Sequence, residues 1–319
     1  MNMEAPLISL IIPVFNREPL LPYTLDSLSA QTHRPLEVVL VDNGSTDGSM
    51  AMCEQFRLQQ DSSFFSVKVL SQPNGGANGA RNAGFEASSG EYVLFFDSDD
   101  TLYPDSLARI AAQLINADAP DMLVFPFQLV FPDGRTSLRP HRFSADPAAQ
   151  LIDTVAATHN MCLKRSLVKA AGLWDESLSR WQDLEFGFRL LLNADTVAWI
   201  NGKPFHEVKV HASSISGHSF AADVKRVDQA LDRIQTSILT VEDASLRHHL
   251  QRALCYKRTV LAGNLWQEGQ RVMSRQHVQK ALHELHGFND RLYTLVLRIS
   301  YLYMKLNGRG FWRIADCLS

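Results

Sequence analysis

The stretch Tyr92-Val93-Leu94-Phe95-Phe96-Asp97-Ser98-Asp99-Asp100 passes from five apolar or aromatic residues directly into three carboxylates. Such an apolar run predicts a strand that is buried on both faces, as in a parallel sheet. The carboxylates then follow the C-terminal end of the strand, where open α/β sheets bind their ligands. Because neighbouring carboxylates repel each other, they indicate a site for a hard cation such as Mg²⁺ or Mn²⁺. A polar turn that caps the next helix explains the same residues equally well.

Two earlier apolar runs also end in polar residues. Residues 7–14 lead into a loop that contains Asn16, and residues 36–41 lead into Asp42. Segments with helical spacing separate the runs, so the first hundred residues predict βαβ units on a mostly parallel sheet. The polar residues after the strands are therefore expected at one edge of the sheet, around a crevice of nucleotide size.

The later parts of the chain differ from this pattern. We expect a strand over residues 121–131, a helix over 181–191, and helices from residue 221 to the end. The predicted fold class is α/β, with a Rossmann-like, mostly parallel sheet flanked by helices and a C-terminal all-helical appendage. The predicted domains are residues 1–220 and 221–319.

The composition excludes several classes of protein. The 319 residues are 45% hydrophobic and 20% charged, as in ordinary soluble globular proteins, and the formal net charge of −3 argues against nucleic acid as a partner. Four widely spaced cysteines show no metal or disulfide pattern. With no basic and apolar leader and no apolar run of about 18 residues, the expected location is the cytoplasm.

Residues 291–313 interleave five cations with five aromatic residues, and the nearest acid is Asp290. This composition is typical of a helix that lies on an anionic membrane surface, and it predicts peripheral contact at the inner face of the cell membrane. A helix that packs on the rest of the chain, or on a second copy in a homo-oligomer, explains the same pattern and stays open.

Short motifs along the chain resemble the family 2 glycosyltransferases of the GT-A fold. The motifs occur in the family's order: Pro13-Val14-Phe15-Asn16, Val41-Asp42-Asn43-Gly44-Ser45-Thr46-Asp47, Ala80-Arg81-Asn82-Ala83-Gly84, Asp97-Ser98-Asp99-Asp100, Trp181-Gln182-Asp183-Leu184-Glu185 and His211. The resemblance covers roughly the first 220 residues and is of the bacterial polysaccharide type. It implies transfer of a sugar, with inversion, from a nucleotide-diphosphate donor such as a UDP-sugar to a glycan or lipid-linked acceptor.

The resemblance also implies a divalent cation, Mn²⁺ or Mg²⁺, that bridges the donor phosphates. Asp99 corresponds to the direct metal ligand, and Asp97 to a residue that contacts the ribose or the metal and its water. His211 completes the metal shell or touches the pyrophosphate; a surface-loop histidine is the structural alternative. Ser98 lies with these residues on the nucleotide side, and Asp100 is expected to start a helix rather than to bind the metal.

Six further residues are expected to form the nucleotide site: Pro13, Phe15, Asn16, Asp42, Asn43 and Arg81. The resemblance implies that Asp42 binds the uracil edge and that Phe15 stacks on the base. Arg81 supplies a planar cation near the base or phosphates. A turn aspartate and a solvated helix residue are the structural alternatives for these two charged side chains. The family often has a second Asp where Asn43 stands, so the preference for uracil is left open.

Asp183 is the expected general base, because an acceptor hydroxyl must lose its proton as it attacks the anomeric carbon. Glu185 is the second choice, since a residue two positions on points elsewhere on a helix. A single base implies one displacement and therefore inversion. Trp181 and Trp174 would suit an acceptor platform or the core equally well.

Two other functions fit parts of the sequence. One is a nucleotide-binding module without catalytic activity. The other is a sugar-phosphate nucleotidyltransferase, which would carry a glycine-rich basic loop after its first strand. That loop here is Phe15-Asn16-Arg17-Glu18-Pro19 and has no glycine, which argues against the second function.

Overall fold

The computed structural model describes residues 5–72, 75–139, 144–210, 219–285 and 290–306. It contains two compact units that interleave along the chain. Unit 1 comprises residues 1–143, 156–179 and 193–212, and unit 2 comprises residues 144–155, 180–192 and 213–319. These units follow spatial contacts rather than chain order, so two short segments upstream of residue 220 belong with the helices. The division into domains at residue 220 stays a prediction.

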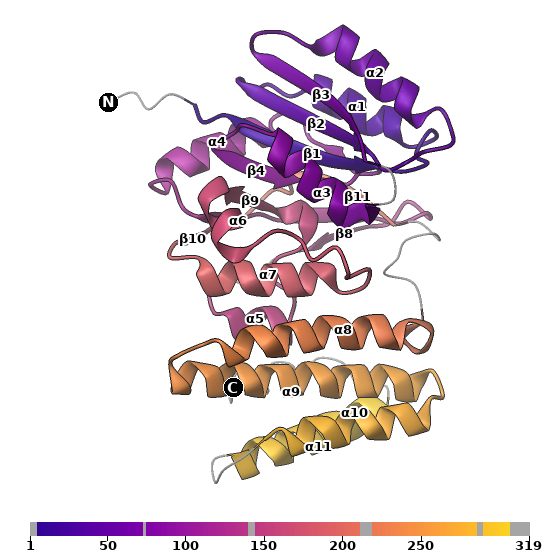
Figure 1. Ribbon diagram of the computed structural model, residues 1–319, viewed down its shortest axis with the longest axis vertical. Helices are drawn as coiled ribbons and strands as arrows, with labels where there is room; N and C mark the ends of the chain where they lie inside the picture. The colour runs from indigo at the N-terminus through magenta and orange to yellow at the C-terminus, as the bar shows by residue number, and fades with distance from the viewer. Residues whose placement is uncertain (1–4, 73–74, 140–143, 211–218, 286–289, 307–319) are drawn as a thin grey trace. The chain divides into compact units, whose positions relative to one another are not determined.

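Unit 1 contains the strands and the helices that cover them (Figure 1). The strands are β1 (Ile8–Val14), β2 (Leu36–Asp42), β3 (Phe65–Ser71), β4 (Tyr92–Phe95), β5 (Thr101–Leu102), β6 (Met122–Val124), β7 (Phe127–Val130), β8 (Thr136–Arg139), β9 (Met161–Lys164), β10 (Val197–Trp199) and β11 (His206–Lys209). The helices are α1 (Leu21–Ser29), α2 (Ser49–Gln60), α3 (Gly76–Ala87), α4 (Ser106–Asn116), the 3₁₀-helix η1 (Thr158–Asn160) and α6 (Arg165–Ala171).

The main sheet has seven strands in the order β10-β6-β9-β4-β1-β2-β3, and a second sheet has the order β5-β11-β7-β8. In the main sheet only β9 runs antiparallel to its neighbours, so the predicted mostly parallel sheet is confirmed. The single strand predicted over residues 121–131 is wrong. The segment forms β6 in one sheet and β7 in the other, and Pro126, which has no N–H to donate to a ladder, lies between them.

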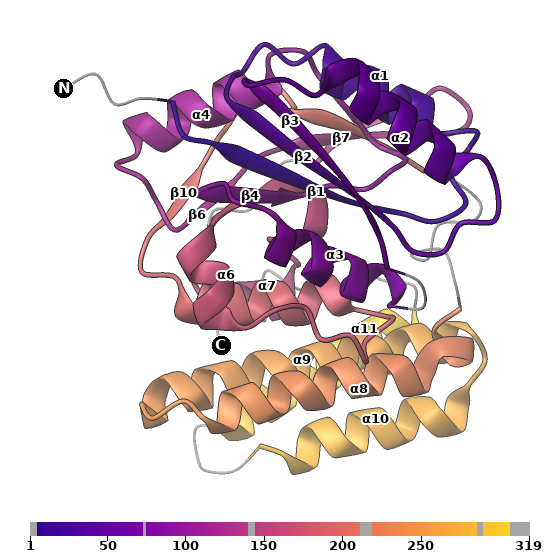
Figure 2. The same ribbon diagram turned by 45° about the horizontal axis from the view of Figure 1, so that its top comes forward.

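Successive residues of β1 face opposite sides of the sheet and so serve two different helix layers. Ile8, Leu10 and Ile12 share one core with apolar residues of α1, α2 and α4. Figure 2 shows these three helices on one face of the sheet and α3 and α6 on the other. On the α3 side, a Cβ on Gly84 would overlap the side chain of Ile11 and crowd that of Val41. Glycine therefore lets α3 lie directly on the sheet, close to the ends of β1 and β2.

Unit 2 is helical, as predicted for the last third of the chain. It contains α5 (Pro147–Ile152), α7 (Gln182–Asn193), α8 (Phe220–Leu239), α9 (Ala244–Gln267), α10 (Arg271–His283) and α11 (Asp290–Lys305). Apolar residues recur at helical spacing along α8, from Val227 through Leu231 and Ile234 to Ile238, and all are buried. They pack into one core around α9, which contacts α5, α8, α10 and α11 (Figure 1).

Among the described residues, no helix has both the length and the apolar composition that a membrane-spanning segment needs.

Candidate active site

The polar residues predicted at the strand ends follow neighbouring strands of the main sheet. The register aligns Val14 of β1 with Asp42 of β2, and Ile11 of β1 with Phe95 of β4. Asn16, Asp42 and Asp97 therefore leave the sheet at its C-terminal edge, in the strand order β4-β1-β2. This is the edge at which open parallel sheets bind nucleotides.

Asp42 and Asn16 hold the loops that follow β1 and β2. The buried Asp42 carboxylate accepts hydrogen bonds from the backbone N–H groups of Gly44 and Ser45, each at 3.1 Å. The Asn16 side-chain oxygen accepts a hydrogen bond from the Thr46 N–H at 2.8 Å, and the backbone N–H of Asn16 donates to the Ser45 hydroxyl at 3.0 Å. Asn16 has a φ of 50°, which asparagine tolerates better than most residues. The two loops thus form one wall, and the base contact of Asp42 stays a prediction.

Other residues of the expected nucleotide site are compatible with a planar ligand at this wall. Phe15 keeps 50% of its side chain exposed, which leaves a ring face for stacking. Pro13 lies beyond Ile11, the last β1 residue paired with β4, so its missing N–H interrupts no ladder on that side. The Asn43 side-chain oxygen is buried and has no hydrogen-bond donor among the described residues. A bound group with an N–H or O–H would satisfy it.

Arg81 of α3 contacts Asp97, which follows strand β4. Its Nη2 donates to Asp97 Oδ1 at 2.9 Å, and its Nη1 donates to Asn78 at 3.1 Å. Asn78 is in turn fixed by two backbone carbonyls, and the guanidinium carbon lies 4.8 Å from the centre of the Trp174 ring. Arg81 is buried, and Asp97, Asn78 and Trp174 contact its guanidinium, so it is not a solvated helix residue. Trp174 is buried against Phe95 and belongs to the core.

The chain turns sharply after β4 and enters the second sheet. The Asp100 N–H donates to the Asp97 carbonyl at 3.3 Å, and β5 follows at once. The prediction that Asp100 starts a helix is wrong, because α4 begins only at Ser106. The buried Asp100 carboxylate instead points into unit 1, where it accepts a hydrogen bond from the Lys209 N–H at 3.3 Å. The turn therefore brings the carboxylates of Asp97 and Asp100 close together at the C-terminal edge of the sheet.

Asp97, Asp100 and His159 form one group, which we call the Asp–Asp–His cluster. Each offers a ligand atom, and the three atoms lie within 4.8 Å of one another. His159 Nδ1 is 3.9 Å from Asp97 Oδ2. The register of β9 explains this proximity, because antiparallel pairing joins Tyr92 to Lys164 and Leu94 to Cys162. Continued by three residues, the same register sets His159 opposite Asp97.

Opposite forces act on the two carboxyl groups of the cluster. Burial raises the pKa of Asp100 well above its usual range, and the charges of Asp97 and Asp99 act in the same direction. Burial also acts to raise the pKa of Asp97, but His159 and Arg81 outweigh it and hold that pKa below its usual range. An added positive charge at this point would favour ionisation of both carboxyl groups.

The cluster fits a divalent cation. Asp100 Oδ2 and His159 Nε2 are buried and have no hydrogen-bond partner among the described residues. Buried polar atoms normally have a hydrogen-bond partner or bind an ion. Carboxylates and imidazole are common ligands of divalent metals. No motif pointed to His159, which precedes a short apolar segment. Only the antiparallel insertion of β9 beside β4 brings it to the site.

Asp99, the direct metal ligand that the family resemblance implies, does not belong to the Asp–Asp–His cluster. Asp99 forms an ion pair with Arg17, with 3.6 Å between its Oδ2 and the arginine Nε, and its side chain is 23% exposed. Ser98 is buried beside it. Their roles stay predictions, and His211 lies outside the described residues.

Asp183, the expected base, lies in the first turn of α7 in unit 2. Trp181 precedes the helix with a φ of 55°, an uncommon conformation for a bulky residue that sets the direction of the helix start. Glu185 is buried and forms a two-point ion pair with Arg189 one turn later, so Glu185 already serves the helix. The choice of Asp183 as the general base stays a prediction, and Glu185 is already paired within α7.

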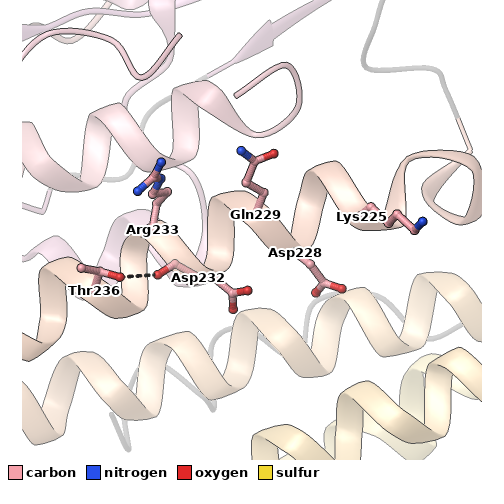
Figure 3. A pocket seen from close by; sticks show the side chains of 6 residues that line it. All are labelled: Lys225, Asp228, Gln229, Asp232, Arg233 and Thr236. Carbon is pink, nitrogen blue, oxygen red and sulfur yellow. Dashed lines mark hydrogen bonds between the residues drawn. The ribbon is translucent and has the colours of Figure 1, made fainter. Parts of the chain in front are cut away.

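Unit 2 also has a polar hollow of about 420 Å³ along α8 (Figure 3). Asp228 and Asp232 point to one side of the helix, and Gln229 and Arg233 point to the other. The Asp232 carboxylate is bound by Arg258 of α9 at 3.1 Å and by Lys280 of α10 at 3.2 Å. Because this acid already joins three helices, the hollow has a structural explanation.

Comparison with known proteins shows the family to which the chain belongs. Residues 9–171, just over half of the chain, match the family described as "Glycosyl transferase family 2". "Putative glycosyltransferase EpsH" of Bacillus subtilis is 30% identical over 225 residues, which cover 67% of this chain and 63% of that protein. "Glycosyltransferase GlyG" of Streptococcus pneumoniae is 36% identical over 114 residues, which cover 35% of this chain and 36% of that protein. The match thus spans less than two thirds of either relative.

Solved structures share the fold at low sequence identity. Staphylococcus aureus TarS 1-349 in complex with UDP-GlcNAc has a TM-score of 0.71 at 18% identity, covering 97% of this chain and 90% of that chain. Mannosyltransferase PcManGT from Pyrobaculum calidifontis in complex with GDP-Man and Mn²⁺ has a TM-score of 0.55 at 17% identity, covering 95% and 88%. The fold is that of the GT-A glycosyltransferases, and the chain belongs to glycosyl transferase family 2.

Proposed function

We propose that this chain is an inverting, metal-dependent glycosyltransferase that moves a sugar from a UDP-sugar to a glycan or lipid-linked acceptor in cell-surface polysaccharide synthesis. The observation that carries the proposal is the Asp–Asp–His cluster at the end of β4, beside the buried Arg81, in a chain of this family. Two carboxylates and an imidazole with unsatisfied atoms form a cation site where the sheet would bind a nucleotide.

A divalent cation bound there would neutralise the donor diphosphate, so that the nucleotide can depart from the sugar. Asp97, Asp100 and His159 are the residues that would hold it, with Asp99 as the alternative that the family resemblance implies. Arg81 adds a positive charge that cannot move away, because Asn78 and Trp174 fix its guanidinium. These residues bind and orient the diphosphate before the sugar is transferred.

The wall formed by the loops after β1 and β2 would receive the nucleoside. Phe15 stacks on the base, and Asn43 accepts a hydrogen bond from it or from the ribose. Pro13, Asn16 and Asp42 keep this wall in shape. The TarS complex with UDP-GlcNAc supports a uridine donor, whereas the PcManGT complex with GDP-Man makes guanosine the alternative to test.

Asp183 would take the proton of the attacking acceptor hydroxyl. With a single base the acceptor attacks directly and the departing nucleotide leaves from the opposite side, so the anomeric centre inverts. The carbonyl of Asp183 accepts a hydrogen bond from the Gln150 side chain at 3.3 Å, which ties the start of α7 to α5 within unit 2. We place the reaction in the cytoplasm, at the inner face of the membrane that carries the acceptor.

The test compares donor binding with sugar transfer in the same variants. Thermal unfolding is followed with UDP-GlcNAc, UDP-glucose and GDP-mannose, each with and without Mn²⁺, because a ligand that binds the folded state raises its stability. We expect one UDP-sugar to stabilise the chain only when Mn²⁺ is present. Asp183→Asn should keep this stabilisation but lower transfer to an added acceptor by about 10²–10⁴-fold.

Asp195→Asn is the matched control, since Asp195 is an exposed carboxylate after the same helix. Its transfer rate should equal that of the unaltered chain. Binding of a nucleotide-sugar without transfer by any form of the chain would identify a catalytically silent module. Stabilisation that is equal with and without Mn²⁺ would contradict the metal-dependent proposal.

A further inference from the structure

Helix α11 carries an apolar stripe on its outward face. The stripe consists of four helix residues, Leu292, Leu295, Ile299 and Leu302, and of Leu306, which directly follows the helix; they recur at intervals of three or four residues. Their side chains are between 44% and 82% exposed. At 1.5 Å per residue, the stripe runs for about 21 Å along the helix. Single exposed apolar residues are normal on a protein surface, whereas a continuous stripe indicates an interaction site.

The opposite face of α11 fixes the helix to unit 2. Tyr293, Val296 and Leu297 are buried, and α11 packs against α9. The Tyr301 hydroxyl lies 2.8 Å from the Ser274 hydroxyl of α10, and the Lys305 ammonium lies 3.9 Å from the centre of the Trp266 ring. Part of the aromatic and cationic composition of residues 291–313 therefore serves internal packing. The stripe is what this packing leaves uncovered.

Cations flank the stripe on one side. Arg291 and Arg298 are exposed, and at 100° per residue both lie next to Leu295 and Leu302 on the helical wheel. Residues 291–306 contain no Asp or Glu. The exposed half of α11 is thus divided into an apolar sector and a cationic sector with no acid. This is the pattern of a helix that lies in the plane of an anionic membrane surface.

We propose that α11 lies flat on an anionic lipid surface. The stripe enters the boundary between headgroups and acyl chains, and Arg291 and Arg298 contact the lipid phosphates. Charge complementarity selects this partner over a second copy of the chain, because a second α11 would bring the same cations to the contact. The proposal refines the place of the reaction given above and rests on the proposed function only for the acceptor that the membrane would carry.

The test is flotation of the full chain with lipid vesicles, which needs no enzymatic activity. Vesicles of phosphatidylcholine alone are compared with vesicles that contain about one third phosphatidylglycerol, at low and at high salt. We expect flotation with the anionic vesicles only, weakened by salt because screening shortens the range of the arginine charges. A triple variant with Leu295→Gln, Ile299→Gln and Leu302→Gln should lower the fraction bound at least about tenfold.

The matched control has Leu58→Gln, Phe64→Gln and Val272→Gln, three exposed apolar residues that do not belong to the stripe. It should float like the unaltered chain. Arg298→Gln, which removes one charge and leaves the apolar surface intact, should reduce the salt-sensitive part of binding even if the triple variant is poorly folded. Equal flotation of all forms would overturn the proposal. So would a fall in molar mass of the triple variant in light scattering, which would identify the stripe as a contact between copies.

Discussion

Both units bury charged side chains, but they do so in opposite ways. In unit 1 two aspartates of the same charge, Asp97 and Asp100, meet at a strand end with His159 beside them. In unit 2 several buried charges meet an opposite charge. Arg258 lies between Asp232 at 3.1 Å and Glu284 at 3.3 Å, and the buried Asp290 accepts from Arg252 at 3.1 Å.

The difference separates a binding site from a structural bond. Removing charges from water costs free energy, and an opposite charge nearby recovers part of it. In unit 2 the protein supplies that opposite charge itself. In the cluster of unit 1, Arg81 pairs with Asp97. Burial, together with the charges of Asp97 and Asp99, raises the pKa of Asp100. A bound cation would bring a positive charge to Asp100, and the proposed function rests on this group, whereas the paired charges of unit 2 stabilise its helices.

The largest loss of activity should follow from a change of Asp97, which belongs to the cluster and also pairs with Arg81. Asp97→Asn leaves the shape of the site but removes its ionised oxygen. We expect the kcat/KM of transfer to fall by about 10³-fold or more, because a metal site contributes several kcal/mol of charge stabilisation. Steady-state kinetics with saturating Mn²⁺ measures this, and thermal unfolding shows whether the variant stays folded. If the activity of Asp97→Asn stays within a few fold of that of the unaltered chain, the cluster is not part of the active site.

In unit 2 the corresponding change should affect stability. Asp232→Asn combined with Glu284→Gln leaves the fully buried Arg258 without its two opposite charges. We expect the free energy of unfolding to fall by about 3–5 kcal/mol, as for other buried charges deprived of a partner. Urea denaturation measures the change. Glu54→Gln, which breaks an exposed pair with Arg57, should cost less than about 1 kcal/mol. If the double variant and Glu54→Gln lose similar free energies of unfolding, the ion pairs of Arg258 do not stabilise unit 2 more than an exposed pair does.

Glu37 shows that unit 1 also satisfies a buried charge when it lies away from the site. It occupies the start of β2, opposite the end that carries Asp42. Burial acts to raise its pKa, but Lys68, the Ser89 N–H and the hydroxyls of Ser9 and Ser89 outweigh this and lower it to about 2. Because the folded-state pKa is below the unfolded value of about 4.5, the stabilisation is complete above pH 4.5 and disappears as the pH falls to about 2.

Unfolding of the unaltered chain and of Glu37→Gln between pH 7 and pH 2 tests this. The difference in free energy should be about 1.5–3 kcal/mol at pH 7, as for hydrogen bonds to a charged group, and should vanish near pH 2. A difference that stays constant over this range would show that the carboxylate charge of Glu37 contributes nothing.

A smaller effect distinguishes the two sets of metal ligands. His159→Asn should weaken Mn²⁺ binding by about tenfold or more, since even a residue behind a ligand can cost that much. Asp99→Asn should cost less, because Asp99 pairs with Arg17 and stands outside the cluster. Calorimetric titration with Mn²⁺ ranks the two variants. The reverse ranking would favour Asp99 as the ligand, as the family motif implies.

Much of unit 1 was predictable from local sequence. Apolar runs define β1, β2 and β4 as buried strands, and the polar residues after them had to meet because parallel strands end at a common edge. The same reasoning predicted Asp97 at that edge, whereas Arg81 was predicted only from the resemblance to the family. It failed at Asp100, where three polar residues suggested a helix start and the chain instead enters the second sheet through β5. A turn and a helix cap use the same residue types, so local sequence does not separate them.

The sequence by itself determined the alternation of strands and helices, the edge at which the site lies and the family motifs that follow each strand. Only the tertiary structure decided that His159 joins the site, that the stripe of α11 stays uncovered, and that Trp174 is core. These depend on pairing between segments far apart in the chain, such as β9 with β4, and on which face of a helix its neighbours cover. Periodicity fixes the faces of an element, but contacts between elements decide which face is buried.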